Sequence, residues 1–231
     1  MKIAAPLHSW EVSPAEAMRI QEELRGKVLL ENELGEVRLV AGIDVSVKED
    51  IAQAAVVVLS YPELEPVEQS LAQVAISFPY IPGLLAFREG PAVLAALEKL
   101  AIEPDLFIFD GQGLAHPRRL GIASHIGVIL DRPSIGCAKS CLWGNYREPP
   151  PQAGARTYLH DKNEIIGAVV RTKDDVRPLF ISIGHKVDLE TAISYVLSCC
   201  RGHRLPETTR YAHRVAGGEK LKIIGSQLSL F

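Results

Sequence analysis

An acidic residue inside an apolar segment is the feature that most constrains how this chain can fold. Residues 37–47 form a run rich in Val and Ile, which is typical of a buried strand, and Asp44 lies inside it. A second apolar run, residues 106–109, leads directly into Asp110. Burying a carboxylate without a partner is costly, and carboxylate oxygens are ligands that Mg²⁺ prefers. The two runs therefore predict a sheet that carries a metal site, with metal-assisted hydrolysis of a phosphate ester as the leading chemistry.

The composition is that of an ordinary globular protein. At 231 residues and 25.2 kDa, with 47% hydrophobic and 23% charged residues, the chain fits one α/β domain with a full core. The sequence has no apolar stretch of membrane-spanning length and no signal-peptide pattern at its start, so we expect a cytoplasmic protein without a membrane partner.

The cysteines do not form a recognisable metal motif. A zinc site needs paired spacing of the C-x-x-C type, and here one pair is separated by three residues and the other is adjacent in sequence. We therefore expect four free thiols: Cys137, Cys141, Cys199 and Cys200.

Positive charge is concentrated in two segments, although the formal net charge of the chain is −3. Residues 201–214 hold four arginines and two histidines against one glutamate, and residues 116–119 follow Asp110 closely with a histidine and two arginines. Basic segments beside a metal site can bind a phosphate backbone even in an acidic protein, but a solvated surface would show the same pattern. Charge alone leaves a nucleic-acid partner undecided.

Apolar periodicity and turn residues predict the order of the elements. Ser13 and Glu16 form a capping box around Pro14, so a helix is expected to begin there and to run to about Leu24. Further helices are expected at 84–101, 118–130, 188–201 and 206–216. Strands are expected at 37–47, 52–60, 67–77, 106–110, 133–138, 155–160, 164–171 and 178–183. An antiparallel meander followed by alternating helices and strands predicts an α/β fold, with a mixed central sheet flanked by helices in a single domain.

Four long blocks of the sequence resemble endonuclease V, in an order that spans about residues 13 to 216. They are FPYIPGLLAFREGP at 78–91, DGQGLAHPRRLGIASH at 110–125, PSIGCAKS at 133–140 and RLPETTRYAH at 204–213. The resemblance implies a ribonuclease-H-like fold, with residues 1–216 as the catalytic domain and 217–231 as a C-terminal tail. It also implies nicking of DNA that contains deoxyinosine, at the second phosphodiester bond on the 3′ side of the lesion. The implied cofactor is Mg²⁺, for which Mn²⁺ can substitute.

The resemblance assigns catalytic roles to five side chains. Asp44 and Asp110 are expected on neighbouring strands where they share the metal. Glu89, on the helix expected at 84–101, completes the acidic cluster. The resemblance also places His213 in the cluster, where it either assists the attacking water or steadies a second metal. Lys139 is the candidate for stabilising charge at the phosphate.

A wedge is expected in the loop of the first block, at Pro79, Tyr80, Ile81 and Pro82. A damaged base must leave the stack to be inspected, and the duplex would otherwise close behind it. The prolines stiffen the loop, so the Tyr80 ring can fill the gap at a low entropic cost. The alternative is an ordinary turn tyrosine that covers a hydrophobic core.

The base pocket needs groups that distinguish hypoxanthine from adenine and guanine. Hypoxanthine offers an O6 acceptor and an N1–H donor, unlike adenine, and it lacks the 2-amino group of guanine. Backbone amides and carbonyls can read both differences, and glycines allow their close approach. The candidates are Gly83, Leu85, Gly111, Gly113, His116 and Gly136.

The last five residues, QLSLF, resemble the short motif by which bacterial repair and replication proteins bind the polymerase sliding clamp. The motif residues are Gln227, Leu228, Leu230 and Phe231. The alternative is that these hydrophobic side chains fold back on their own domain.

Two other functions remain open from the sequence. An endoribonuclease acting on inosine-containing RNA would use the same site, and no residue reveals how a 2′-hydroxyl is handled. A nucleic-acid-binding protein that has lost its chemistry is disfavoured, because the acidic residues and His213 are all present.

Overall fold

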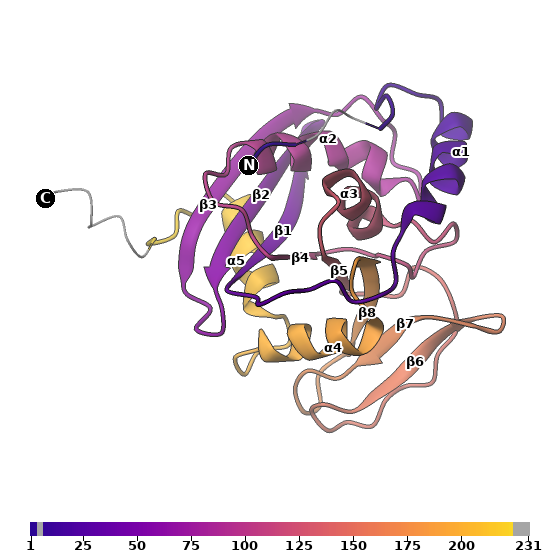
Figure 1. The fold of residues 1–231 in the computed structure, drawn as a ribbon, viewed down its shortest axis with the longest axis vertical. Helices are drawn as coiled ribbons and strands as arrows, with labels where there is room; N and C mark the ends of the chain where they lie inside the picture. The colour runs from indigo at the N-terminus through magenta and orange to yellow at the C-terminus, as the bar shows by residue number, and fades with distance from the viewer. Residues whose placement is uncertain (4–6, 224–231) are drawn as a thin grey trace, which may run out of the picture.

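A mixed sheet of eight strands forms the centre of the computed structural model, which describes residues 1–3 and 7–223 (Figure 1). The strand order is β3-β2-β1-β4-β5-β8-β7-β6. The strands are β1 (Leu39–Lys48), β2 (Ile51–Ser60), β3 (Pro66–Ala75), β4 (Leu106–Phe109), β5 (Ser134–Ala138), β6 (Arg156–Asp161), β7 (Glu164–Val170) and β8 (Leu179–His185). The helices are α1 (Pro14–Leu24), the 3₁₀ turn η1 (Arg25–Lys27), α2 (Leu85–Glu98), α3 (Ile122–Leu130), α4 (Leu189–Ser198) and α5 (Glu207–Ala216).

The first three strands form the predicted antiparallel meander, and β4 then joins β1 in parallel. Ile43 pairs with Phe109, so Asp44, which lies inside β1, is beside Asp110, which directly follows β4. The prediction that these two aspartates lie on neighbouring central strands is confirmed.

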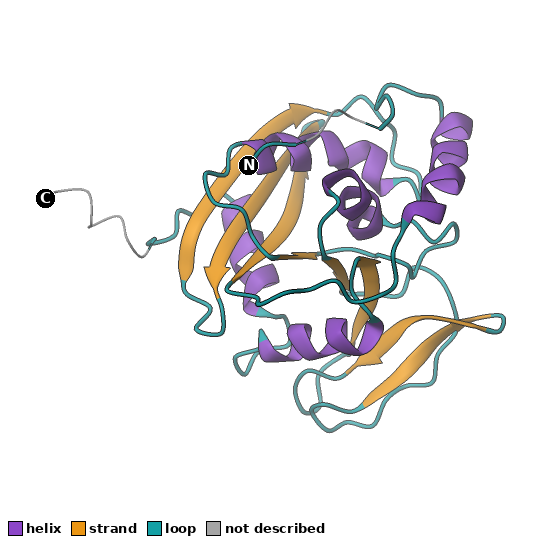
Figure 2. Cartoon of the chain, in the orientation of Figure 1, coloured by secondary structure: helices purple, strands orange, loops and turns teal. Residues whose placement is uncertain are grey.

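Helices cover both faces of the sheet (Figure 2). On one face, Val93 and Leu97 of α2 and Ile126 of α3 pack in one cluster with alternate residues of β1, β2 and β4. On the other face, residues of α4 and α5, such as Val196 and Val215, pack against the remaining alternate positions. This arrangement confirms the predicted fold class, a single α/β domain with a mixed sheet between layers of helices.

One predicted helix begins later than expected. The prediction of a helix over 118–130 is wrong at its start, because α3 begins at Ile122. Arg119 has a left-handed backbone with φ of 57°, and a Cβ on Gly121 would lie 2.2 Å from the carbonyl oxygen of Gln112. The turn at 118–121 therefore packs closely under the preceding loop and cannot continue the helix.

Two other expectations from composition can be compared with the structure. All four cysteines are free thiols, and Cys137 and Cys199 are buried. Within residues 1–3 and 7–223, no helix is both long enough and apolar enough to cross a membrane.

Candidate functional site

Three carboxylates from three different parts of the chain gather near the carboxyl end of β4. Asp44 lies in the second half of β1, Asp110 directly follows β4, and Glu89 lies in the first half of α2. Asp44 and Asp110 are largely buried, with side chains 12% and 9% exposed. The strand pairing positions the two aspartates, and the packing of α2 on the same face of the sheet brings Glu89 toward them.

Mutual repulsion shows that the three acids act as one electrostatic cluster. Burial, followed by the negative charges of Asp44 and Asp110, raises the pKa of Glu89 to about 8, although Arg88 opposes the shift. Burial also raises the pKa of Asp110, and Lys139 opposes this through its hydrogen bond. Such a cluster concentrates negative charge in a place where water screens it poorly.

Each aspartate already has a basic partner. His213, on α5, donates a hydrogen bond from Nδ1 to Oδ2 of Asp44 at 2.8 Å, and Lys139 forms an ion pair with Asp110. Arg204 donates a hydrogen bond from Nη2 to the carbonyl oxygen of Lys139 at 2.8 Å, so the backbone that carries this lysine is fixed. The structure therefore brings together all five side chains that the sequence predicted to be catalytic.

The oxygen donors of this cluster match a hard divalent cation. Asp44, Glu89 and Asp110 supply only carboxylate oxygens, which suit Mg²⁺ or Mn²⁺ better than softer metals. A bound cation would also relieve the repulsion from the neighbouring aspartates that raises the pKa of Glu89. Among the described side chains, however, no three His, Cys, Asp or Glu residues are close enough together to ligate a metal directly. His213 and Lys139 already contact Asp44 and Asp110, so a cation would compete with them for the aspartate oxygens.

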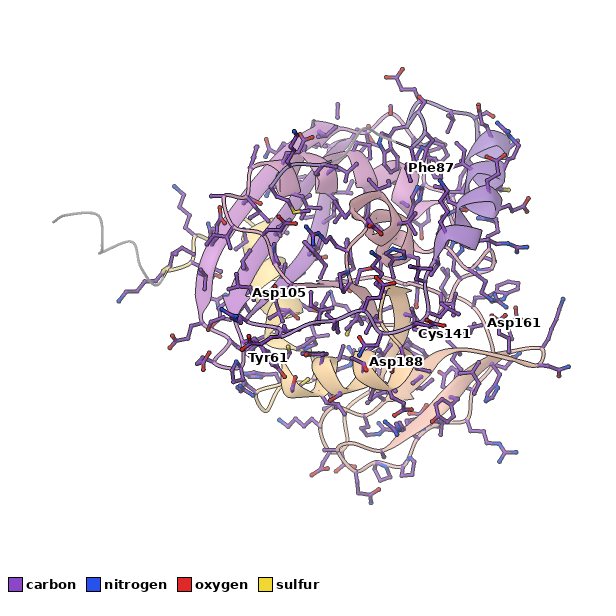
Figure 3. The ribbon with its side chains drawn as sticks, viewed as in Figure 1. Tyr61, Phe87, Asp105, Cys141, Asp161 and Asp188 are labelled. Atoms are coloured by element: carbon purple, nitrogen blue, oxygen red, sulfur yellow. The ribbon has the colours of Figure 1, made fainter. Side chains whose placement is uncertain are left out.

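A cavity of about 330 Å³ opens beside the acidic cluster, and Asp110 and Lys139 form part of its wall. Three of the four predicted wedge residues line it, namely Tyr80, Ile81 and Pro82. Four of the six predicted base-pocket residues also line it, namely Gly83, Leu85, Gly111 and His116. The remaining wedge residue, Pro79, lies outside the lining. Cys141 marks the position of the cavity in Figure 3.

His116 is a neutral, fixed hydrogen-bonding group in this wall. Burial lowers its pKa to about 4, so the ring is uncharged at neutral pH. Its Nε2 lies 2.8 Å from the carbonyl oxygen of Gly83, and its Nδ1 lies 3.1 Å from the backbone nitrogen of Arg118. Because a carbonyl only accepts and a backbone N–H only donates, the proton must reside on Nε2. The imidazole therefore locks Gly83 in place.

The two other predicted pocket glycines lie beneath the cavity and do not line it. A Cβ on Gly113 would lie 2.0 Å from the carbonyl oxygen of Ile183, and one on Gly136 would lie 2.3 Å from the backbone nitrogen of Gly113. Both positions need glycine because backbone segments cross there without room for a side chain. Their observed contacts hold the loop after β4 against β5 and β8.

Two glutamines that were not predicted from the sequence also line the cavity. Gln21 of α1 donates from Nε2 to the carbonyl oxygens of Gly83 and Leu120, both at 3.1 Å. Gln112 donates from Nε2 to the carbonyl oxygen of Ser140 at 2.9 Å. The position of Gln112 between two glycines of the second block was an available signal. For Gln21, the only signal was a polar residue on the buried side of an amphipathic helix.

Comparison with known proteins identifies the family of this chain. The Endonuclease V family model matches residues 22–214. Endonuclease V of Roseiflexus sp. (strain RS-1) is 54% identical over 207 residues, which cover 90% of this chain and 93% of that protein.

Solved structures of endonuclease V also match this chain. The crystal structure of endonuclease V from Streptomyces avermitilis has a TM-score of 0.87 and 40% identity, and the match covers 94% of this chain and 97% of that one. Endonuclease V of Ciona intestinalis, solved in complex with a 24mer DNA containing an inosine followed by a ribo-adenosine, has a TM-score of 0.77 and 33% identity. That match covers 88% of this chain and 96% of that one. The chain therefore belongs to the endonuclease V family and is a nuclease by family membership.

Proposed function

We propose that the protein is a Mg²⁺-dependent repair endonuclease that recognises deoxyinosine in DNA and nicks the strand at the second phosphodiester bond on its 3′ side. The observation that carries this proposal is that Asp110 belongs both to the acidic cluster and to the wall of the cavity. A base held in the cavity would therefore keep its own strand next to the carboxylates. The Ciona intestinalis relative binds DNA that contains inosine, which supports the choice of lesion.

The side chains divide the chemistry between them. A metal that displaces His213 and Lys139 from the aspartates and draws Asp44, Glu89 and Asp110 together would supply charge stabilisation at the scissile phosphate and a water of lowered pKa. Lys139, whose side chain is 37% exposed beside Asp110, would neutralise developing negative charge on the phosphate. His213 holds its Nδ1 proton on Asp44, so Nε2 of a neutral ring can accept a hydrogen bond from the attacking water.

Inosine-containing RNA is the second candidate substrate. The DNA in the Ciona intestinalis complex carries a ribo-adenosine after the inosine, so that family member accommodates a 2′-hydroxyl at the 3′ neighbour. The same catalytic groups would serve either backbone.

Strand cleavage by the purified protein in Mg²⁺ separates the two candidates. Four end-labelled oligonucleotides are compared: inosine-containing DNA, undamaged DNA, inosine-containing RNA and unmodified RNA. A single nick two phosphodiester bonds 3′ of deoxyinosine is expected for the first alone. Cleavage of the inosine RNA alone would replace DNA by RNA as the substrate, and lesion binding without any cleavage would refute a catalytic role.

Substitution of Tyr80 by Ala is expected to weaken binding of deoxyinosine DNA by about tenfold or more, because the ring that fills the gap in the stack is lost. Tyr80 is 71% exposed and lines the cavity, so the substitution should not disturb the core. Gel-shift or anisotropy titration measures the change, with Tyr158 to Ala, an exposed aromatic on β6, as the control. Unchanged lesion affinity in the Tyr80 variant would return this side chain to a packing role.

Metal affinity is expected to rise with pH until about pH 8. Below its pKa of about 8, Glu89 is mostly protonated, so a cation must displace the proton to use this carboxylate. The apparent Mg²⁺ affinity should then increase by up to tenfold per pH unit between about pH 6 and pH 8, and level off above. Nicking rates measured against Mg²⁺ concentration at several pH values test this. A wild-type profile that stays flat across this range, or one that Glu89 to Gln leaves unchanged, would contradict the assignment.

The clamp motif at residues 227–231 lies outside the described residues and remains a proposal from the sequence. Its partner is the bacterial polymerase sliding clamp. Binding to an immobilised clamp that persists after deletion of residues 227–231 would refute it.

A further inference from the structure

A large aromatic side chain that has no role in the chemistry described above belongs to the residue next to a cavity-lining residue. Leu142 lines the cavity, and the next residue, Trp143, is 44% exposed. The loop that carries both follows Lys139, so it extends directly from the acidic cluster to the cavity rim. An exposed indole at such a place is either an incidental surface residue or a contact for the ligand.

Hydrogen bonds hold this indole in a defined position. Trp143 donates from Nε1 to Oδ2 of Asp161 at 2.9 Å, and the same oxygen accepts from Nη2 of Arg119 at 2.7 Å. Asp161 lies at the end of β6, across from the loop that carries Cys141 (Figure 3). The loop after β5 is therefore tied to the β6–β7 hairpin through the indole.

The same arginine connects the indole to the cavity wall. Arg119 also donates from Nη1 to the carbonyl oxygen of His116 at 2.8 Å and from Nε to Glu164 at 2.8 Å. Its side chain is 16% exposed, and its backbone is left-handed, with φ of 57°. A continuous series of contacts thus runs from the wall residue His116 through Arg119 and Asp161 to Trp143.

A neighbouring aromatic gives a useful contrast. Tyr158 of β6 is 37% exposed, and its hydroxyl donates to Glu190 of α4 at 3.1 Å, so it belongs to the helix side of the hairpin. It does not line the cavity, whereas the loop that carries Trp143 does. Exposure alone does not distinguish the two rings, but the hydrogen-bonded connection to the cavity wall does.

We propose that Trp143 is a stacking platform for an unpaired nucleobase next to the inspected base, on the strand that carries the lesion. The proposal rests on the proposed function, because it assumes that a nucleic-acid strand enters the cavity. Extrusion of one base leaves its neighbours with an unstacked face, and an aromatic ring that is already fixed can cover such a face with little loss of entropy. Tyr80 and Trp143, from two different loops of the rim, would then contact the strand at two points.

Removal of the ring is the first test. Trp143 to Ala is expected to weaken binding of deoxyinosine DNA by about tenfold, within the range measured for loss of one base–aromatic stack. Trp143 to Phe, which keeps a ring but loses the bond to Asp161, should weaken it by about threefold or less. Tyr158 to Ala is the matched control and should bind like the wild type. Binding is measured by anisotropy in EDTA, so that cleavage does not interfere.

Fluorescence gives a readout that a purely structural role would not change. The chain has two tryptophans, Trp10 and Trp143, so a Trp10 to Phe variant reports on Trp143 alone. Stacking on a base should quench this emission on titration with deoxyinosine DNA, and much less on titration with undamaged duplex. Quenching together with the loss of affinity in Trp143 to Ala would support the platform.

The outcomes separate failure of this proposal from failure of the proposed function. If the wild type binds and nicks deoxyinosine DNA but the Trp143 emission does not change, and Trp143 to Ala binds equally well, the stacking role is refuted and the function stands. If the wild type binds no inosine-containing strand, both fail together. If Trp143 to Ala has a lowered melting temperature, its loss of affinity could come from unfolding. The emission of the Trp10 to Phe protein, in which the Trp143 ring is intact, then decides whether the ring stacks on a base.

Discussion

Replacement of Asp110 by Ala is expected to lower the rate of deoxyinosine nicking at least about 10³-fold, or about 4 kcal/mol of transition-state stabilisation, while DNA binding persists. In the proposed mechanism, the variant loses one of the carboxylates that would hold the metal, and it leaves Glu89 and Asp44 without the third carboxylate of the cluster. It also frees Lys139 from its ion pair. Because a negative charge near the phosphate backbone disappears, affinity for DNA should be equal to or tighter than that of the wild type.

The fold should not suffer from this substitution. Burial raises the pKa of Asp110, which means that the native state disfavours the charged form of this side chain. The melting temperature of Asp110 to Ala should therefore equal or exceed that of the wild type. Single-turnover nicking, anisotropy titration in EDTA and a thermal melt together test the prediction, with Glu98 to Ala, an exposed acid at the end of α2, as the control. Nicking within tenfold of the wild type would remove Asp110 from the chemistry.

Local pattern was sufficient to predict the elements that carry the acids. The Val and Ile content of residues 37–47 predicted β1, and the break at Asp110 predicted the end of β4. The pairing of β1 with β4, which places Asp44 beside Asp110, joins segments distant in sequence, and it was expected from the family resemblance rather than from local pattern. The two strand predictions succeeded because each depends on residues close together in sequence, where periodicity is informative.

Contacts between distant segments were not predictable in the same way. Trp143 and Asp161 are joined only when the loop after β5 meets the β6–β7 hairpin, and Gln21 reaches Gly83 only when α1 docks near the cavity. Nothing in the local sequence of these residues distinguishes them from surface polar or aromatic residues. The glycine candidates show the same limit. Gly113 lies in a motif that predicted the base pocket, but it is glycine because another backbone segment passes too close for a side chain.

Gly42 explains how His213 reaches its position, and its substitution by Ala is expected to damage both stability and activity. A Cβ at Gly42 would lie 2.0 Å from the carbonyl oxygen of Thr208, a fully buried residue in the first turn of α5. The helix would have to move away from β1, which would cost about 1–3 kcal/mol and lower the melting temperature by roughly 2–12 °C.

The same movement should break the 2.8 Å hydrogen bond between His213 and Asp44, so nicking should fall by about tenfold or more. Loss of stability alone would leave the activity of the folded fraction intact. A double-mutant cycle separates loss of stability from loss of the contact between His213 and Asp44. In the Gly42 to Ala background, His213 to Ala should add little further loss, because its contact with Asp44 is already gone. Gly26, with nothing within 4 Å of an added Cβ, provides the control, and its Ala variant should melt and cleave like the wild type. Full additivity in the cycle would show instead that α5 keeps its place and that the close approach at Gly42 does not position His213.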